Sequence, residues 1–179
     1  MISVVRTSIA AAQVDAVVNA ANEAFRGGGG VDGIIHREAG PALLQECMQY
    51  SRLPTGSAIL TKGHRLPARW IIHTVGPIWR AGFSEPSLLE HAYKSVFRIA
   101  RERGDIRTIA FPAISTGAYG YPKRPAAQIA VEAMRRNEDA FDEIVVCLMD
   151  TENIAAYEEA LRGLRVMDLV QVSAKGPCI

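Results

Sequence analysis

The feature that most constrains this chain is a run of four consecutive glycines, Gly27 to Gly30, between an apolar stretch and a helical pattern. Val17-Val18 leads into two amides, Asn19 and Asn22, and the glycines are followed by Asp32 where a helix should begin. Glycine loses more conformational freedom on folding than any other residue, so four in a row are costly in a folded chain. We therefore expect a ligand to lie close against this backbone.

Apolar, β-branched segments alternate with helical patterns along the chain, and this alternation predicts the fold. We expect strands over residues 1–5, 14–18, 57–61, 69–74, 108–114 and 143–149, and helices over 31–39, 41–50, 87–103, 125–136 and 153–164. Such alternation favours an α/β sandwich with much of its sheet parallel. We assign residues 1–164 to one domain and expect a C-terminal strand or tail over 165–179, with 166–172 as the candidate strand.

Composition limits the classes of binding partner and the cellular compartment that we expect for this protein. The net charge of +1 creates no strong field toward nucleic acid or an anionic membrane, so neither is an expected partner. No apolar run approaches the roughly 18 residues of a membrane span, and the N-terminus has no signal-peptide pattern. Three widely separated cysteines, Cys47, Cys147 and Cys178, argue against a disulfide framework. We therefore expect a reducing compartment, the cytoplasm.

The glycine run does not indicate a dinucleotide oxidoreductase. Gly28 to Gly33 formally matches G-x-G-x-x-G, but that fingerprint needs its glycines directly after a strand. Here eight residues separate Val18 from Gly27. A glycine loop at a helix start still exposes backbone N–H groups and the positive end of the helix dipole, which suit a phosphate. The simpler alternative is a flexible surface loop.

A second loop of small residues, Ser115 to Gly120, follows a predicted strand and precedes a predicted helix. In open α/β sheets ligands bind at the carboxyl ends of the strands, where both loops should lie. The two loops together can hold two phosphates. Tyr119 either covers an attached sugar or packs under its own loop.

Asn22 and Asp32 are the polar pair of interest. An amide can hold a sugar hydroxyl through both its donor and its acceptor, and a carboxylate beside it can deprotonate a water molecule. Capping the helix is the simpler role for Asp32, and Asn19 is expected to tie loop backbone together. His36 follows Asp32 by four residues, on the same helical face, where it orients Asp32, contacts the ligand or simply packs.

The sequence contains no zinc motif and no nucleophile signature, so we expect no metal and no cofactor. The chemistry of the residues therefore points to a phosphate ester acted on by water without a covalent intermediate.

Four segments together resemble one known family. They are VVNAAN at 17–22, GGGGVDGIIHREAGP at 27–41, IHTVGPIW at 72–79 and AFPAISTGAYGYP at 110–122. They are similar to the macrodomain family, and most of all to its MacroD-type branch of ADP-ribosyl hydrolases. The resemblance covers about residues 1 to 164 in the right order.

The resemblance implies a three-layer α/β/α domain with a central mixed sheet of about six strands. It implies ADP-ribose as the ligand, ADP-ribosylated protein and O-acetyl-ADP-ribose as partners, and two reactions: removal of mono-ADP-ribose from acidic side chains and deacetylation of O-acetyl-ADP-ribose. The implied catalytic residues are Asn22, Asp32 and His36. The implied ligand-binding residues are Ser8, Ile9, Asn22, Gly29, Gly30, Val31, Asp32, Ser115, Thr116, Gly117, Ala118 and Tyr119.

Two departures concern the adenine end of the implied ligand. The family usually has Gly-Asp-Ile after its first strand, where the aspartate accepts the adenine amino group, whereas this chain has Thr7-Ser8-Ile9. Relatives often place an aromatic ring against adenine where this chain has Leu148-Met149. We therefore expect weak ADP-ribose affinity or tolerance of another base. The alternatives to an enzyme are a non-catalytic reader of ADP-ribose and a macrodomain with altered nucleotide preference.

Overall fold

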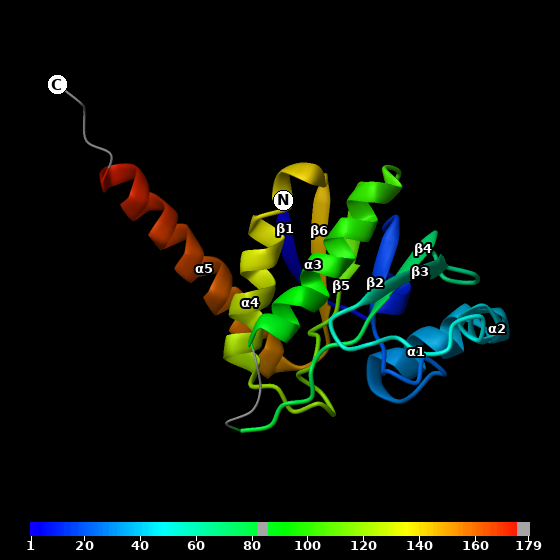
Figure 1. The fold of residues 1–179 in the computed structure, drawn as a ribbon. Coiled ribbons are helices and arrows are strands. Elements are labelled where there is room, and N and C mark those ends of the chain that lie inside the picture. Colours follow the sequence, from blue (N-terminus) through cyan, green and yellow to red (C-terminus); the bar gives the residue numbers. More distant parts are fainter. Residues whose placement is uncertain (82–85, 175–179) are drawn as a thin grey trace.

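Six strands form one mixed sheet in the computed structural model, which describes residues 1–81 and 86–174, with side chains described up to residue 163 (Figure 1). The strands are β1 (Ile2–Arg6), β2 (Ala16–Ala20), β3 (Ala58–Lys62), β4 (Trp70–Thr74), β5 (Thr108–Phe111) and β6 (Glu143–Leu148). Their order in space is β1-β6-β5-β2-β4-β3. All neighbours are parallel except the edge strand β3, which is antiparallel to β4.

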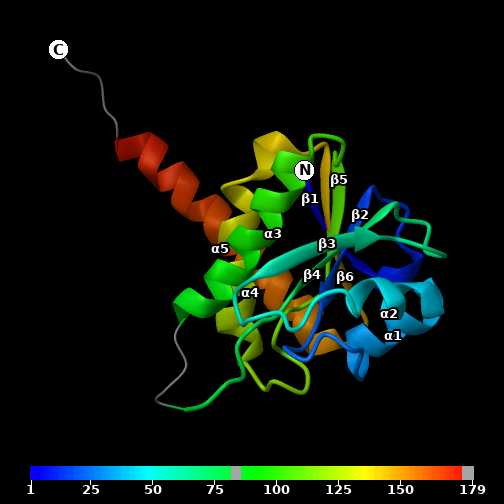
Figure 2. The same cartoon turned by 45° about the vertical axis from the view of Figure 1, so that its right-hand side comes forward.

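Helices cover both faces of the sheet. The α-helices are α1 (Gly30–Ala39), α2 (Pro41–Cys47), α3 (Pro86–Arg103), α4 (Lys123–Arg135) and α5 (Thr151–Ala174), and short 3₁₀ helices span Ile9–Ala11 and Glu138–Ala140. Figures 1 and 2 show α1 and α2 on one side of the sheet and α3, α4 and α5 on the other. The predicted three-layer α/β/α sandwich with a largely parallel sheet is confirmed.

Alternating side chains of the strands enter two separate cores, because successive residues of a strand point to opposite faces. Val17 and Ile71 lie in the core under α1 and α2, together with Ile35 and Leu43 of those helices. The next residues along the same strands, Val18 and Ile72, lie in the core under α3, α4 and α5. A parallel sheet covered on both faces therefore reads in the sequence as nearly continuous apolar runs.

Several element boundaries differ from the predicted ones. β2 extends to Ala20, so Asn19 belongs to a strand and not to a loop. β5 ends at Phe111 because the next residue, Pro112, has no backbone N–H to donate. The predicted strand over 166–172 was wrong, since the backbone there continues helix α5 to Ala174. The last part of the predicted tail, 175–179, lies outside the described residues.

Candidate functional site

The sheet splits at the carboxyl ends of β2 and β5, and this split defines the candidate site. The two strands pair at only two positions, Ala16 with Ile109 and Val17 with Ala110. After β2 the chain turns to the α1 side of the sheet, and after β5 it turns to the α4 side. Adjacent parallel strands whose connections diverge in this way leave a crevice between their loops, which is where ligands bind in open α/β sheets.

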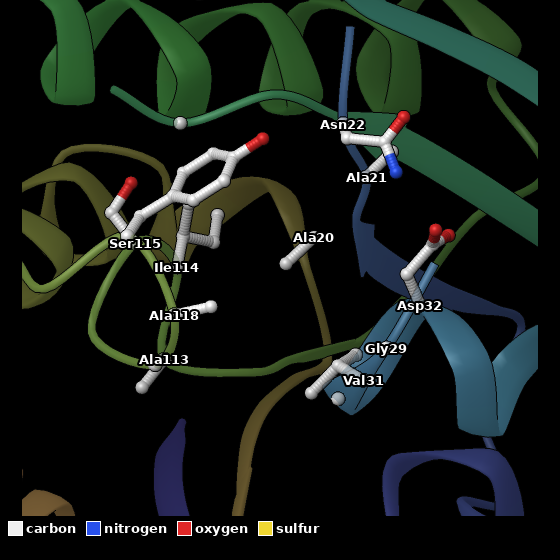
Figure 3. Close-up of a pocket in the computed structure, with 14 residues that line it drawn as sticks. Ala20, Ala21, Asn22, Gly29, Val31, Asp32, Ala113, Ile114, Ser115 and Ala118 are labelled. Carbon is white, nitrogen blue, oxygen red and sulfur yellow. The ribbon is translucent and has the colours of Figure 1, made fainter. Parts of the chain in front are cut away.

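A cavity of about 260 Å³ occupies this crevice. It is lined by Ala20, Ala21, Asn22, Gly29, Gly30, Val31, Asp32, Gly76, Ala113, Ile114, Ser115, Gly117, Ala118 and Tyr119. In Figure 3, Asn22 and Asp32 lie on one side of the cavity with their polar ends toward one another, and Ser115 and Ala118 lie on the opposite side. The glycine loop and the second small-residue loop, distant in sequence, therefore face one another across a single cavity.

Asp32 is a buried carboxylate on one side of this cavity. It lies in the first turn of α1 and is only 4% exposed. Its Oδ1 accepts a hydrogen bond of 2.6 Å from Asn19 Nδ2, and its Oδ2 has no hydrogen-bond partner in the described chain. The predicted capping role was wrong, because Gly29 is the N-cap residue of α1 and no side chain forms a capping hydrogen bond there.

Burial raises the pKa of the Asp32 carboxyl above its usual value, while the Asn19 hydrogen bond and His36 act in the opposite direction. His36 lies one turn along the helix, with its Nε2 3.5 Å from Asp32 Oδ1, so the predicted shared face is confirmed. A carboxylate that is partly desolvated, held at one oxygen and unpartnered at the other is suited to accept a proton.

The two amides form different hydrogen bonds, and those of Asn19 differ from the prediction. Asn22 ties the loop backbone together, since its Oδ1 accepts from the Phe25 N–H at 3.1 Å and its Nδ2 donates to the Gly27 carbonyl at 3.0 Å. The prediction that Asn19 does this was wrong, because Asn19 is fully buried and bonded to Asp32 and His73. Asn22 nevertheless lines the cavity. The loop bonds orient its amide beside Asp32.

The glycine loop lies against the protein on one side and against the cavity on the other. A Cβ atom at Gly28 would be 2.9 Å from Asn22 Nδ2 and 3.2 Å from Asp32 Oδ2. At Gly29 the same atom would meet nothing within 4 Å. The sequence predicts that a ligand lies close against the glycine backbone, but at Gly28 the close neighbours are the side chains of Asn22 and Asp32. Gly29 and Gly30 line the cavity and leave open space for a ligand.

Residues that flank the glycines anchor the loop. The Phe25 ring is 1% exposed and packs edge-on against His73, with 4.9 Å between the ring centroids. Glu23 accepts hydrogen bonds from the backbone and hydroxyl of Thr55. Arg26 donates to the carbonyl of Cys47, the last residue of α2, and to that of Tyr50 just beyond the helix. These anchors hold the segment between Asn22 and the glycines in place.

The second loop is held by its own backbone and by a close approach to the chain after β4. Ser115 has φ of +69°, and its carbonyl accepts from the Tyr121 N–H at 2.9 Å. A Cβ atom at Gly76 would be 2.1 Å from the Ser115 Oγ. Tyr119 is half-buried and lines the cavity, and burial together with Glu23 and Asp32 raises its pKa. Its ring therefore lies at the site and not wholly under its own loop.

Four predicted site residues do not line the cavity within the described chain: Ser8, Ile9, Thr116 and His36. Ile9 is buried in the core under α1, and the Thr116 hydroxyl donates to the Ala113 carbonyl. At the expected adenine end, Leu148 is also a core residue, whereas Met149 is 64% exposed. The residue roles taken from the resemblance remain predictions.

Five lining residues did not appear in the sequence prediction: Ala20, Ala21, Gly76, Ala113 and Ile114. All of them follow the carboxyl end of β2, β4 or β5 or lie at it. Knowledge of the strand order would have identified them, but the strand order cannot be predicted from the pattern of apolar residues.

The described residues include no group of three or more His, Cys, Asp or Glu side chains placed to hold a metal ion. Within residues 1–81 and 86–174, no helix combines the length and the apolar character needed to cross a membrane.

Comparison with known proteins agrees with this geometry. A family model described as Macro domain matches residues 18–130. The O-acetyl-ADP-ribose deacetylase of Citrobacter rodentium is 46% identical, over 89% of this chain and 94% of that protein. ADP-ribose glycohydrolase MACROD2 of Xenopus laevis is also 46% identical, over 89% of this chain and 40% of that protein. A solved structure of the Oceanobacillus iheyensis macrodomain with ADP superimposes with a TM-score of 0.86 and 38% identity, covering 92% of this chain and 91% of that one. This chain therefore belongs to the macro domain family.

Proposed function

We propose that this protein is a hydrolase that removes mono-ADP-ribose from ester-linked acidic side chains and deacetylates O-acetyl-ADP-ribose. Two relatives, each 46% identical to this chain, are named for reactions on ADP-ribose compounds. The cavity between the two loops is suited to hold a diphosphate. The adjacent Asn22 and Asp32 are suited to hold a sugar-linked ester at the end of that diphosphate.

The observation that carries the proposal is the state of the Asp32 carboxylate. Its Oδ1 is bound by Asn19, and its Oδ2 is buried at the cavity with no hydrogen-bond partner in the described chain. A module that only binds ADP-ribose has no chemical need for such a buried carboxylate, whose desolvation is unfavourable. A general base does need one, because its raised pKa makes it a better proton acceptor.

In the proposed reaction, Asp32 orients a water molecule and accepts its proton as the water attacks the ester. The water oxygen forms a bond to the carbonyl carbon of the ester, the bond from that carbon to the ribose oxygen breaks, and the ribose oxygen takes up the proton from Asp32. Free ADP-ribose and the carboxylic acid then leave. Asn22 holds the distal ribose, and the loops Gly29 to Val31 and Ser115 to Tyr119 hold the diphosphate. No side chain forms a covalent intermediate.

The experiment is incubation with a protein mono-ADP-ribosylated on Glu or Asp, and separately with O-acetyl-ADP-ribose, following the release of ADP-ribose or acetate. We expect turnover of both by the wild type and loss of turnover in Asp32→Ala with ADP-ribose binding retained. Glu38→Gln is the matched control, since Glu38 lies on the same helix and is 53% exposed on its side chain, where it pairs only with Arg37 among the described residues. Its turnover should equal that of the wild type.

Other outcomes identify the alternatives. Binding of ADP-ribose without turnover of either ester would mean that the protein is a reader. Unchanged turnover by Asp32→Ala would mean that another group, such as a substrate phosphate, activates the water. Tighter binding of a different nucleotide diphosphate ribose would indicate altered nucleotide preference.

A further inference from the structure

A row of buried polar side chains crosses three strands beneath Asp32. It consists of Asn19 on β2, His73 on β4 and Thr61 on β3. Asn19 and His73 are 0% exposed and Thr61 is 1% exposed. None of the three lines the cavity. Buried polar groups in an otherwise apolar layer reduce stability unless they are fully hydrogen-bonded, so a row of three calls for an explanation.

Strand register brings these residues together. Asn19 of β2 is directly paired with His73 of β4. His73 is paired with Ile59 of β3, and Thr61 lies two residues further along that strand, on the same face. This face is the one covered by α1, because Asn19 and His73 alternate with residues of the opposite core such as Val18 and Ile72. The row therefore begins under α1 and ends at the sheet edge.

The hydrogen bonds of the row diverge from the amide nitrogen of Asn19, toward Asp32 on one side and toward His73 and Thr61 on the other. Asn19 Nδ2 donates to Asp32 Oδ1 at 2.6 Å and also faces His73 Nδ1 at 3.0 Å. An amide nitrogen can only donate, so His73 Nδ1 must accept and the ring proton must be on Nε2. That N–H faces Thr61 Oγ1 at 2.8 Å, and the Thr61 hydroxyl donates in turn to the Lys62 carbonyl at 3.3 Å.

We propose that Thr61, His73 and Asn19 form a positioning chain for Asp32. Thr61 sets the Nε2–H tautomer of His73, that tautomer directs both Asn19 N–H groups as donors, and Asn19 holds Asp32 Oδ1 so that Oδ2 is the oxygen presented to the water. The inference rests on the proposed function for Asp32 as the base. It assigns a role to Thr61, a residue without contact to the cavity.

The other tautomer is incompatible with the bond between Asn19 and Asp32. A proton on His73 Nδ1 would face the Asn19 N–H at a donor–donor distance of 3.0 Å, and the amide would have to turn away from Asp32. A protonated ring would have the same conflict. Burial also lowers the pKa of His73 to about 3, so the ring is neutral at physiological pH.

The test is the pair Thr61→Val and Thr61→Ser. Valine has nearly the shape of threonine but cannot accept the His73 proton, whereas serine keeps the hydroxyl. We expect Thr61→Val to lower kcat roughly tenfold, the size of one lost hydrogen bond, with KM and ADP-ribose affinity unchanged. Thr61→Ser should keep the wild-type kcat.

The pH profile provides a readout that mere packing would not move. The Asn19 bond lowers the pKa of Asp32, so weakening it should raise that pKa and shift the acid limb of kcat to higher pH. The other titratable groups near Asp32 are His36 on the same helix, His73 on β4, Cys47 on α2 and Tyr119 on the second loop. Thr61→Val leaves all of them in the chain, and Thr61→Ser should keep the wild-type limb.

Two NMR measurements test the positioning chain of Thr61, His73 and Asn19 without relying on turnover. The ¹⁵N shifts of His73 in the wild type should report the neutral Nε2–H tautomer, and the ¹³C titration of the Asp32 carboxyl should move to higher pH in Thr61→Val. A proton on Nδ1, or a Thr61→Val protein with unchanged kcat and unchanged Asp32 titration, would overturn the proposal. If Thr61→Val does not fold, the tautomer of His73 in the wild type still tests the proposal. If the wild type has no turnover, the proposed function fails while the two NMR measurements still test the chain.

Discussion

The contact of Gly28 with both polar residues of the site predicts that Gly28→Ala impairs turnover while the protein stays folded. A Cβ atom there would be 2.9 Å from Asn22 Nδ2 and 3.2 Å from Asp32 Oδ2. Ordinary contact needs about 3.5 Å, so the neighbours must move by about half an ångström. Gly28 does not have a left-handed backbone, so the effect comes from the contact and not from the dihedral angle.

The size of the effect follows from how firmly the neighbours are held. Asn22 makes two hydrogen bonds to the loop and Asp32 accepts one from Asn19, so neither side chain can retreat without weakening a bond. Overpacking of this kind costs about 1–3 kcal/mol of stability. Displacement of a base and a substrate-holding amide by a fraction of an ångström should lower kcat/KM roughly tenfold to a hundredfold.

The adjacent residue supplies the control. At Gly29 a new methyl group meets no protein atom within 4 Å, and the backbone φ of −97° suits any residue. Gly29→Ala should therefore keep the wild-type free energy of unfolding in urea and the wild-type kcat at saturating O-acetyl-ADP-ribose, with any change confined to ligand affinity. Equal losses of kcat in the two variants, or no loss in Gly28→Ala, would refute the steric reasoning.

Three further predictions follow from the charges and pKa values. Folding raises the pKa of Asp32 and so favours its protonated form, which means that its contribution to stability is lost as pH rises through that pKa. Asp32→Asn should therefore unfold at a higher Tm than the wild type at neutral pH, and the difference should be smaller in acid. A lower Tm of Asp32→Asn at neutral pH would contradict this. Ser8→Asp should tighten ADP-ribose binding roughly tenfold to a hundredfold in calorimetry, but not binding of the hypoxanthine analogue, which lacks the amino group. Burial raises the pKa of the Cys47 and Cys147 thiols to about 11, so peptide mapping should find neither alkylated by iodoacetamide at neutral pH until the protein is unfolded.

The different surroundings of Asn19 and Asn22 illustrate what local reasoning misses. Both amides flank the same short segment, and the sequence offers no reason to bury one and leave the other at the cavity. Asn19 is buried because β2 continues through it and pairs with β4. Asn22 follows the end of that strand, where its side chain can bond to the loop and still reach the cavity. The extent of one strand therefore decided both roles.

The sequence by itself determined the layers, most of the elements and the two loops of the site. These properties depend on local patterns: apolar runs make buried strands, 3.6-residue spacing makes helices, and small residues after a strand make close backbone approach possible. The motifs also identified Asn22, Asp32 and Tyr119, which all line the cavity.

Only the tertiary structure decided which of these residues meet. The crevice depends on β2 lying beside β5, and the row beneath Asp32 depends on Asn19, His73 and Thr61 falling in register on three strands. Strand order and register arise from contacts between residues far apart in the chain, and a residue's own neighbours in sequence do not specify them. His73 and Thr61 therefore look like ordinary strand residues in the sequence and become part of the site only when the sheet assembles.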